Sequence, residues 1–268
     1  MTPDTKLLLV GCGKMGSALL QRMADKVQAY IVEPSEAPAI FEKANIVWLS
    51  TPDKISPAFQ PDIIILAIKP QSMACALPAY ARYKNCVFLS IAAGITTAHL
   101  ENSLGKDNHA IVRCMPNLPA SIGQGMSVAV ANKNVTLKQR NLCDEFIRAV
   151  GETAWVEDES LIDAVTALSG SGPAYVFALC EAMAKAGEVL GLNPEMAARL
   201  ARQTLVGSGA LLAQSTESVE ALRAAVTSPK GTTEAALSEL MALNGLPELM
   251  QKTMTAALRR AQELAKSA

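Results

Sequence analysis

The segment Lys6-Leu-Leu-Leu-Val10, followed directly by Gly11-Cys12-Gly13-Lys14-Met15-Gly16, decides the fold of this chain. Its first five residues form a short apolar run, which is typical of a strand buried on both faces. Residues 17–23 then have apolar positions at helical spacing. A Gly-x-Gly-x-x-Gly turn between a strand and a helix indicates a βαβ unit that binds a dinucleotide, the alternative being an ordinary tight turn.

Each glycine has a separate role in this pattern. Gly11 permits the tight turn, Gly13 lets the backbone approach a pyrophosphate, and Gly16 lets the helix pack closely on the strand. The helix that opens here presents unpaired N–H groups to the phosphates, with Lys14 and Met15 in its first turn. We therefore expect these five residues to bind the cofactor.

An acidic residue, Glu33, stands at the end of the second expected strand, 17 residues beyond Gly16. A carboxylate in this place accepts hydrogen bonds from a free ribose 2′-OH and repels a 2′-phosphate, which favours NADH over NADPH. The alternative is a solvated acid in a loop, and Lys14 or Lys43 could still attract a phosphate. The preference between NADH and NADPH therefore stays open.

Apolar runs alternate with helical segments through the first half of the chain. The runs after the first strand lie at residues 29–32, 46–49, 63–68, 87–91 and 111–115. This alternation predicts an α/β fold with an N-terminal Rossmann-like, doubly wound parallel sheet.

The pattern changes after residues 153–156. The acidic cluster Glu157–Ser160 suits the start of a helix, and helical patterns dominate from there on. We place the domain boundary near residue 158. The expected organisation is a dinucleotide-binding Rossmann domain at 1–158 and an all-helical substrate-binding and dimerisation domain at 159–268.

Several expected helices of the second half are apolar nearly all round. The segment Ala197–Ala213 has only Arg199 and Arg202 as charged residues, and a helix without a polar face is usually buried. A helical domain of about 110 residues has difficulty burying several such helices alone. We expect a homodimer with intertwined helical domains, the alternative being a compact monomeric bundle.

The composition excludes several classes of function. Half of the 268 residues are hydrophobic, 18% are charged and the formal net charge is −1, which argues against binding of nucleic acid or an anionic membrane. The longest charge-free stretches contain Pro, Gly, Ser or Asn, so none is a membrane span. Leu9–Cys12 resembles a lipoprotein cleavage box, but the apolar run before it is shorter than the roughly 7–15 residues that a secretory signal needs, so we interpret it as a buried strand and expect a cytoplasmic protein.

The cysteines and histidines offer little chemistry. Six scattered cysteines include no Cys-x-x-Cys, so we expect reduced thiols and no metal site. His99 and His109 lie in no recognisable catalytic setting and are expected to be structural or exposed. Hydride transfer to a carbonyl normally needs a placed proton donor, whereas an imine can arrive already protonated.

Three further motifs stand at places where ligands bind. Ala67-Ile68-Lys69-Pro70 and Arg113–Asn117 end expected parallel strands, at the edge of the sheet where ligands bind. Ser228-Pro229-Lys230-Gly231-Thr232-Thr233 is a turn that opens a helix. Threonine hydroxyls and free N–H groups at such an opening can bind a small carboxylate, the alternative being an ordinary Ser/Thr helix cap.

Together these segments make the chain resemble the pyrroline-5-carboxylate reductase family over essentially its whole length. The resemblance rests on Gly11–Gly16, Ala67–Pro70, Arg113–Pro119, Ala167–Tyr175 and above all Leu222–Leu240. It implies reduction of 1-pyrroline-5-carboxylate to L-proline by hydride from NAD(P)H, the last step of proline biosynthesis. It also implies a dimer of interlocked helical domains, often assembled further into a ring of dimers.

The resemblance also implies roles for particular residues. The loop Ser228–Thr233 would bind the substrate, with N–H groups around Gly231, Thr232 and Thr233 on its carboxylate. The Thr233 hydroxyl would be the proton donor or the contact to the ring nitrogen. Glu159 matches an acid near the substrate, its alternative being a helix-start residue. The ribose and nicotinamide end of the cofactor would be lined by Ala67, Ile68, Lys69, Pro70, Ala92, Ala93 and Gly94.

Two positions depart from the family pattern. Lys230 replaces a small residue, often glycine, which could alter the substrate loop or add a cationic contact. Glu33 stands where members that prefer NADPH usually carry a small or basic residue.

Two other functions fit the general plan less well. A β-hydroxyacid dehydrogenase would carry Lys and Asn where Val176 and Cys180 stand when its motif is aligned on Gly170 and Gly172. A nicotinamide-binding regulator would have no need of a carboxylate-binding helix start.

Overall fold

The computed structural model describes residues 4–267, and the chain falls into two compact units. The first unit comprises the chain up to Gly170 together with the residues from Leu258 on, and the second comprises Ser171–Ala257. Within residues 4–267 no helix combines the length and the hydropathy that crossing a membrane requires.

The first unit contains an eight-stranded sheet in the order β3-β2-β1-β4-β5-β6-β7-β8. Its strands are β1 Lys6–Val10, β2 Gln28–Val32, β3 Ile46–Leu49, β4 Ile63–Leu66, β5 Val87–Ser90, β6 Ala110–Met115, β7 Gly125–Ala131 and β8 Gly151–Trp155. All neighbouring strands run parallel except β6 and β7. The predicted Rossmann-like parallel sheet is therefore confirmed, and the reversal of order at β1 and β4 creates the crevice where such sheets bind ligands.

The antiparallel strand β7 was not predicted. The link between β6 and β7 covers only residues 116–124, which is shorter than the dozen or so residues that a parallel crossover needs. The chain therefore turns back and runs antiparallel to β6. The helix α4, Leu137–Arg148, then restores a parallel connection between β7 and β8.

Short helices accompany this sheet. The α-helices of the first unit are α1 Lys14–Met23, α2 Met73–Ala76, α3 Thr97–Ser103, α4 Leu137–Arg148 and α5 Leu161–Val165. Short 3₁₀ segments lie at Ala24–Lys26, Ala39–Phe41, Pro52–Lys54, Pro70–Ser72, Leu77–Tyr80 and Leu118–Ile122, and Thr166–Gly170 is a π-helical turn.

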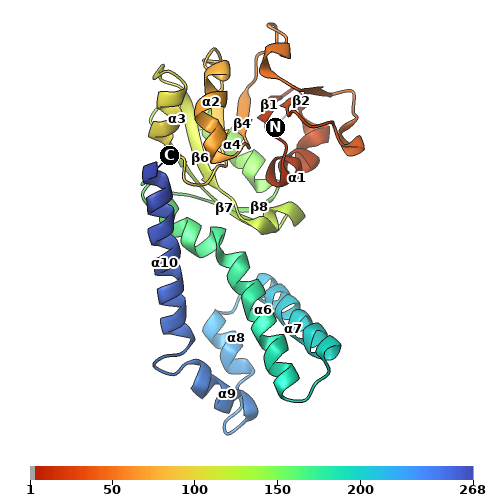
Figure 1. Cartoon of the computed structure of the whole chain (residues 1–268), viewed down its shortest axis with the longest axis vertical. Coiled ribbons are helices and arrows are strands. Elements are labelled where there is room, and N and C mark those ends of the chain that lie inside the picture. Colours follow the sequence, from red (N-terminus) through yellow and green to blue (C-terminus); the bar gives the residue numbers. More distant parts are fainter. Residues whose placement is uncertain (1–3, 268) are drawn as a thin grey trace. The chain divides into compact units, whose positions relative to one another are not determined.

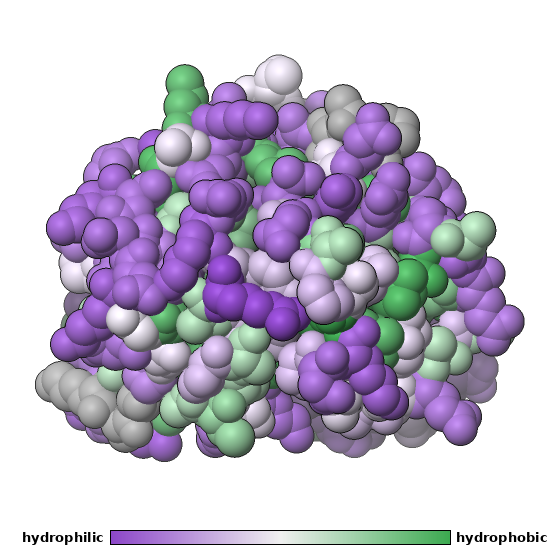
Figure 2. Space-filling model, turned by 90° about the horizontal axis from the view of Figure 1, so that it is seen from above, coloured by the Kyte–Doolittle hydropathy of each residue, from purple (hydrophilic) through white to green (hydrophobic). Residues whose placement is uncertain are grey.

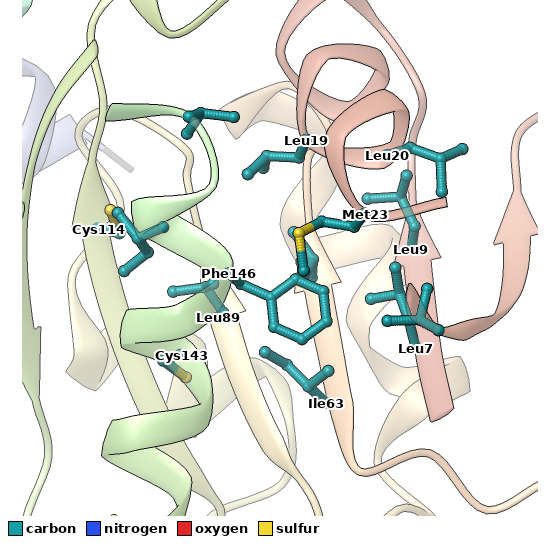
Figure 3. Packing of buried hydrophobic residues seen from close by; sticks show 14 of the residues in the cluster. Leu7, Leu9, Leu19, Leu20, Met23, Ile63, Leu89, Cys114, Cys143 and Phe146 are labelled. Carbon is teal, nitrogen blue, oxygen red and sulfur yellow. The ribbon is translucent and has the colours of Figure 1, made fainter. Parts of the chain in front are cut away.

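The central strands β1, β4 and β5 bury both faces, as the apolar run at β1 predicts. Leu7 and Leu9 pack into one cluster and Leu8 and Val10 into another, because successive side chains of a strand point to opposite faces. Figure 3 shows the first cluster, in which α1 and α4 cover the strands. Its labelled members are Leu7, Leu9, Leu19, Leu20, Met23, Ile63, Leu89, Cys114, Cys143 and Phe146.

The second unit is helical throughout. Its helices are α6 Gly172–Val189, α7 Pro194–Gln214, α8 Val219–Ala225, α9 Thr232–Leu240 and the first part of α10 Leu246–Ser267. The helices α6 and α7 form a hairpin (Figure 1) and approach closely at Gly187, where an added Cβ would lie 3.2 Å from the Ala197 Cβ.

This unit leaves much apolar surface uncovered. Of the residues of α7, only Ala197 and Ala201 are buried. By contrast, the face shown in Figure 2 is covered largely by hydrophilic side chains. The larger exposed apolar residues of the unit are Val176, Phe177, Leu179, Met183, Val189, Leu190, Leu192, Met196, Leu200, Val206, Leu211, Leu212, Val219, Val226, Leu240, Met241, Leu243 and Leu249. A single chain therefore does not bury the apolar helix that the sequence predicts to be buried.

Candidate cofactor and substrate residues

The glycine-rich turn has the geometry that a dinucleotide cradle requires. Gly11 has a φ of +84°, and a Cβ there would lie 2.8 Å from the Ala67 carbonyl oxygen. A Cβ on Gly16 would lie 2.7 Å from the Gly11 carbonyl oxygen, whereas one on Gly13 would meet nothing within 4 Å. Gly11 thus lets the turn lie against the residues that follow β4, Gly16 lets α1 lie against the turn, and Gly13 leaves open space beside the backbone. This turn fits a pyrophosphate.

The start of α1 adds hydrogen-bond donors to this cradle. The helix begins after Gly13, and its first intrahelical bond runs from the Ser17 N–H to the Gly13 carbonyl at 2.8 Å. The N–H groups of Lys14, Met15 and Gly16 precede that bond and point out of the helix end. Together with the helix dipole, they give this helix end the chemistry that can bind an anion.

Glu33 lies directly beside the turn. Its Oε2 accepts the Cys12 backbone N–H at 2.9 Å, and its Oε1 accepts the Ser35 N–H at 3.2 Å and the Ser35 hydroxyl at 3.0 Å. Burial by itself raises the pKa of Glu33, but the hydrogen bonds from Cys12 and Ser35 outweigh it and leave the pKa below its usual range. The group that would meet the ribose is therefore a carboxylate anion.

The cysteine in the turn is held as a thiol. Burial raises the pKa of Cys12, a hydrogen bond with Ser17 lowers it, and the charge of Glu33 raises it again.

Of the two lysines that could attract a 2′-phosphate, Lys43 forms an ion pair with Asp25, with 2.6 Å between its Nζ and the Asp25 Oδ1.

Two further segments follow parallel strands at the same edge of the sheet. Ala67–Pro70 follows β4, and Ala92–Gly94 follows the neighbouring β5. A cavity of about 390 Å³ lies there, lined by Pro70, Gln71, Ala74, Ala93, Gly94, His99 and Leu264. The sequence-predicted residues Pro70, Ala93 and Gly94 thus share one cavity.

The same cavity is lined by four residues that the sequence did not predict, Gln71, Ala74, His99 and Leu264, and the last two come from distant segments. His99 lies on α3, and Leu264 lies in the last turns of α10. Leu264 is close to the segment after β5, since an added Cβ on Gly94 would lie 3.6 Å from the Leu264 Cβ. No local pattern indicates that residues so far apart meet. His109, in contrast, is buried with its Nε2 3.1 Å from the Ala81 carbonyl oxygen and its ring edge against Phe88, as a structural residue would be.

Glu159 is held by other residues of the first unit, to which it belongs. Its Oε1 lies 2.9 Å from Nη1 of Arg113, and the two carboxylate oxygens accept the N–H and the hydroxyl of Thr97 at 2.9 and 2.5 Å. Arg113 also lies 3.6 Å from a carboxylate oxygen of Asp163. Within the described residues, 4–267, no cluster of His, Cys, Asp and Glu could hold a metal ion.

The predicted substrate loop lies in the second unit, between α8 and α9. The Gly231 N–H donates to the Ser228 carbonyl at 3.0 Å, which closes a tight turn. Lys230 in this turn has a φ of +58°, and its N–H donates to the Glu234 carboxylate at 2.7 Å. The left-handed conformation explains why glycine is the natural residue at this position.

The helix after this loop opens with free donors. Gly231 is the residue before α9, and no side chain in residues 4–267 caps this helix end. The first intrahelical bond runs from the Ala235 N–H to the Gly231 carbonyl at 3.2 Å. The N–H groups of Thr232 and Thr233 therefore precede it and can receive a carboxylate.

Two protein-family models match separate parts of this chain. Residues 159–264 match the family model "Pyrroline-5-carboxylate reductase dimerisation", and residues 6–94 match "NADP oxidoreductase coenzyme F420-dependent". The pyrroline-5-carboxylate reductase of Pseudomonas aeruginosa is 40% identical over 270 residues, which cover 97% of each chain.

Solved structures agree over the whole chain as well. A pyrroline-5-carboxylate reductase from Coxiella burnetii superposes with a TM-score of 0.89 at 34% identity, covering 97% of this chain and 98% of that one. The Plasmodium falciparum pyrroline carboxylate reductase with NADP bound superposes with a TM-score of 0.82 at 28% identity, covering 99% and 100%. By its sequence and its fold alike, this chain belongs to the pyrroline-5-carboxylate reductase family.

Proposed function

We propose that this protein reduces 1-pyrroline-5-carboxylate to L-proline with a hydride from NADH or NADPH, the last step of proline biosynthesis. The observation that carries the proposal is the start of α9, where the Thr232 and Thr233 N–H groups stand free after the Ser228–Gly231 turn. A small cyclic imino acid with one carboxylate suits such a helix end. The sequence similarity to pyrroline-5-carboxylate reductases over nearly the full length supports the same substrate.

The residues of this chain act mainly by positioning. The Ser228–Thr233 loop holds the substrate carboxylate through the N–H groups around Gly231, Thr232 and Thr233. Orientation of the imine and exclusion of water then supply most of the rate enhancement. When bound, the reduced nicotinamide supplies the hydride that the ring carbon accepts.

The proton requirement is small. A threonine hydroxyl is too weak an acid to protonate a free imine, so the iminium is the reacting form. The hydride then converts C=N⁺ into an amine without a further proton, and the Thr233 hydroxyl contacts the ring nitrogen during this change. Glu159 belongs to the residues near the substrate.

The cofactor would lie along the edge of the sheet that carries the glycine-rich turn. Gly11, Gly13, Lys14, Met15 and Gly16 hold the pyrophosphate. Ala67, Ile68, Lys69, Pro70, Ala92, Ala93 and Gly94 line the ribose and the nicotinamide. Glu33 meets the adenosine ribose, and its negative charge favours NADH, whereas the solved Plasmodium relative is described with NADP bound.

The functional division of the chain follows from these roles. Residues 1–158 bind the dinucleotide, and residues 159–268 bind the substrate and dimerise. The exposed apolar side chains of α6 and α7 pair with a second copy in an interlocked homodimer, which can assemble into a ring of dimers. The enzyme acts in the cytoplasm.

Parallel assays of NADH and NADPH oxidation with 1-pyrroline-5-carboxylate test the proposal. We expect stoichiometric formation of L-proline, measured by chromatography, with both cofactors. The ratio of the two kcat/KM values then measures the effect of Glu33. A protein that binds the dinucleotide but forms no proline would contradict the proposed reaction, and light scattering in solution would report the dimer separately.

A further inference from the structure

A buried arginine joins three elements of the first unit. Arg113 lies on β6 in register with Ser90 of β5, and its side chain is only 4% exposed. Its guanidinium lies 2.9 Å from Glu159 and 3.6 Å from Asp163, two carboxylates on the segment that follows β8. One cation thus faces two anions, and both anions are largely buried, with side chains 27% and 17% exposed.

Glu159 also binds the start of α3. Its two oxygens accept both the backbone N–H and the hydroxyl of Thr97, the first residue of α3. Arg113 and Thr97 lie 46 and 62 residues from Glu159 along the chain. A single carboxylate therefore fixes the start of α3 against the sheet.

The segment held in this way is the one expected to face the nicotinamide. It runs from the end of β5 at Ser90, which is completely buried, to Thr97. Between these fixed ends, Gly94 has a φ of +76°, and Ala93 and Gly94 line the 390 Å³ cavity. Loss of the Thr97 contacts would therefore alter the conformation of residues 92–96.

Stability alone does not account for the network. Buried ion pairs add little net stability, because removing two charges from water costs about as much as their attraction returns. They do fix the relative position of the elements that carry them. A network of this kind between a strand and a loop at the ligand-binding edge suits a positioning role.

We propose that Arg113 and Glu159 are positioning residues, which hold residues 92–96 through Thr97 in the conformation that receives the nicotinamide end of the dinucleotide. This inference rests on the proposed function. In addition to its proposed place near the substrate, it assigns to Glu159 an effect on the cofactor through Thr97.

Thr97→Val and Thr97→Ser form a matched pair for the test. Valine keeps the shape and the backbone N–H but loses the hydroxyl that Glu159 binds, whereas serine keeps both donors. Each variant is titrated with NADH, followed by nicotinamide fluorescence, and with ADP-ribose, which lacks only the nicotinamide. Glu159→Gln is measured in the same way, since substitution of the buried Arg113 could prevent folding.

We expect Thr97→Val and Glu159→Gln to lose about tenfold in NADH affinity, with a smaller change in nicotinamide fluorescence. Their affinity for ADP-ribose and the properties of Thr97→Ser should stay within about twofold of the wild type. Equal behaviour of the valine and serine variants would overturn the proposal. So would a Glu159→Gln variant in which only the KM for 1-pyrroline-5-carboxylate changes. A wild type that binds NADH but forms no proline would contradict the proposed reaction and leave this inference standing.

Discussion

The carboxylate of Glu33 accepts the backbone N–H of Cys12 at 2.9 Å, so the end of β2 is tied to the tip of the glycine-rich turn. The same carboxylate accepts two hydrogen bonds from Ser35. A fixed negative charge therefore stands beside the place where the adenosine ribose is expected. This arrangement makes cofactor choice the first property to test.

Glu33→Gln should shift the preference toward NADPH. The amide keeps the shape of the side chain and removes the charge that repels a 2′-phosphate, so the NADPH-to-NADH ratio of kcat/KM should rise about tenfold. Steady-state kinetics with both cofactors measure this ratio. Ser35→Ala is the control, because it removes a donor to Glu33 and keeps the charge. An unchanged ratio in Glu33→Gln would mean that the carboxylate does not meet the ribose.

Gly13→Ala and Gly16→Ala should separate binding from stability. A Cβ on Gly16 would lie 2.7 Å from the Gly11 carbonyl oxygen, so the helix must shift, at a cost of about 1–3 kcal/mol in the free energy of unfolding. A Cβ on Gly13 meets nothing within 4 Å, so stability should fall by less than about 1 kcal/mol. The NADH affinity of Gly13→Ala should nevertheless fall at least about tenfold, because the methyl group would occupy the space proposed for the pyrophosphate.

Urea unfolding and fluorescence titration measure the two effects in the same preparations. Wild-type NADH affinity in Gly13→Ala would show that no pyrophosphate approaches this turn. An unaltered free energy of unfolding in Gly16→Ala would contradict the close packing of α1 on β1.

Lys230→Gly should stabilise the protein. Lys230 has a φ of +58°, a conformation that costs a residue with a Cβ about 1 kcal/mol, so glycine should raise the free energy of unfolding by about 0.5–1 kcal/mol. Lys230→Met removes the same charge and keeps the strain. A rise in the KM for 1-pyrroline-5-carboxylate in both variants would show that the ammonium group contributes to binding. Stabilisation of the methionine variant alone would contradict this explanation.

Thr233→Ala should lower turnover without abolishing it. In the proposed reaction the N–H of residue 233 still binds the carboxylate and the iminium is the reacting form, so kcat should fall by about tenfold. Thr233→Ser keeps the hydroxyl and should stay close to the wild type. Full activity of the alanine variant at every pH would mean that this hydroxyl does not contact the ring nitrogen.

Asp144→Asn should reduce stability at neutral pH and lose its effect in acid. Burial raises the pKa of Asp144, but hydrogen bonds from Arg148, Trp155 and Thr153 and the charge of Arg148 outweigh it, so the pKa lies below its ordinary value. A lowered pKa stabilises the fold above the unfolded-state pKa of about 3.9, and this contribution disappears as the pH falls through the folded-state value.

We expect Asp144→Asn to cost about 1–3 kcal/mol at pH 7, and the difference from the wild type to shrink below about pH 4. Urea unfolding at several pH values measures this. Asp25→Asn is the matched control, because Asp25 is 82% exposed in its pair with Lys43 and should contribute little. A difference for Asp144→Asn that stays constant from neutral to acid pH would contradict the explanation.

Local sequence was sufficient for the parts of the fold that depend on neighbouring residues. The apolar run Lys6–Val10 and the glycines that follow it predict the strand, the turn and α1, because strand burial and helical spacing are properties of a few successive residues. The same holds for the turn Ser228–Gly231 and the helix that opens after it. The two segments that we propose as ligand-binding are therefore recognisable from the amino-acid sequence alone.

Only the tertiary structure decided how distant segments meet. The antiparallel direction of β7 follows from the short link 116–124 and from the free edge of β6 with which β7 pairs. Local propensity carries no information about either. Two sets of contacts join residues that are far apart in the chain. Glu159 contacts both Arg113 and Thr97, and Leu264 lies beside Gly94. Such contacts depend on the order of the strands in the sheet. Periodicity and propensity reach only a few residues along the chain, whereas an ion pair depends on where the whole fold places its two partners.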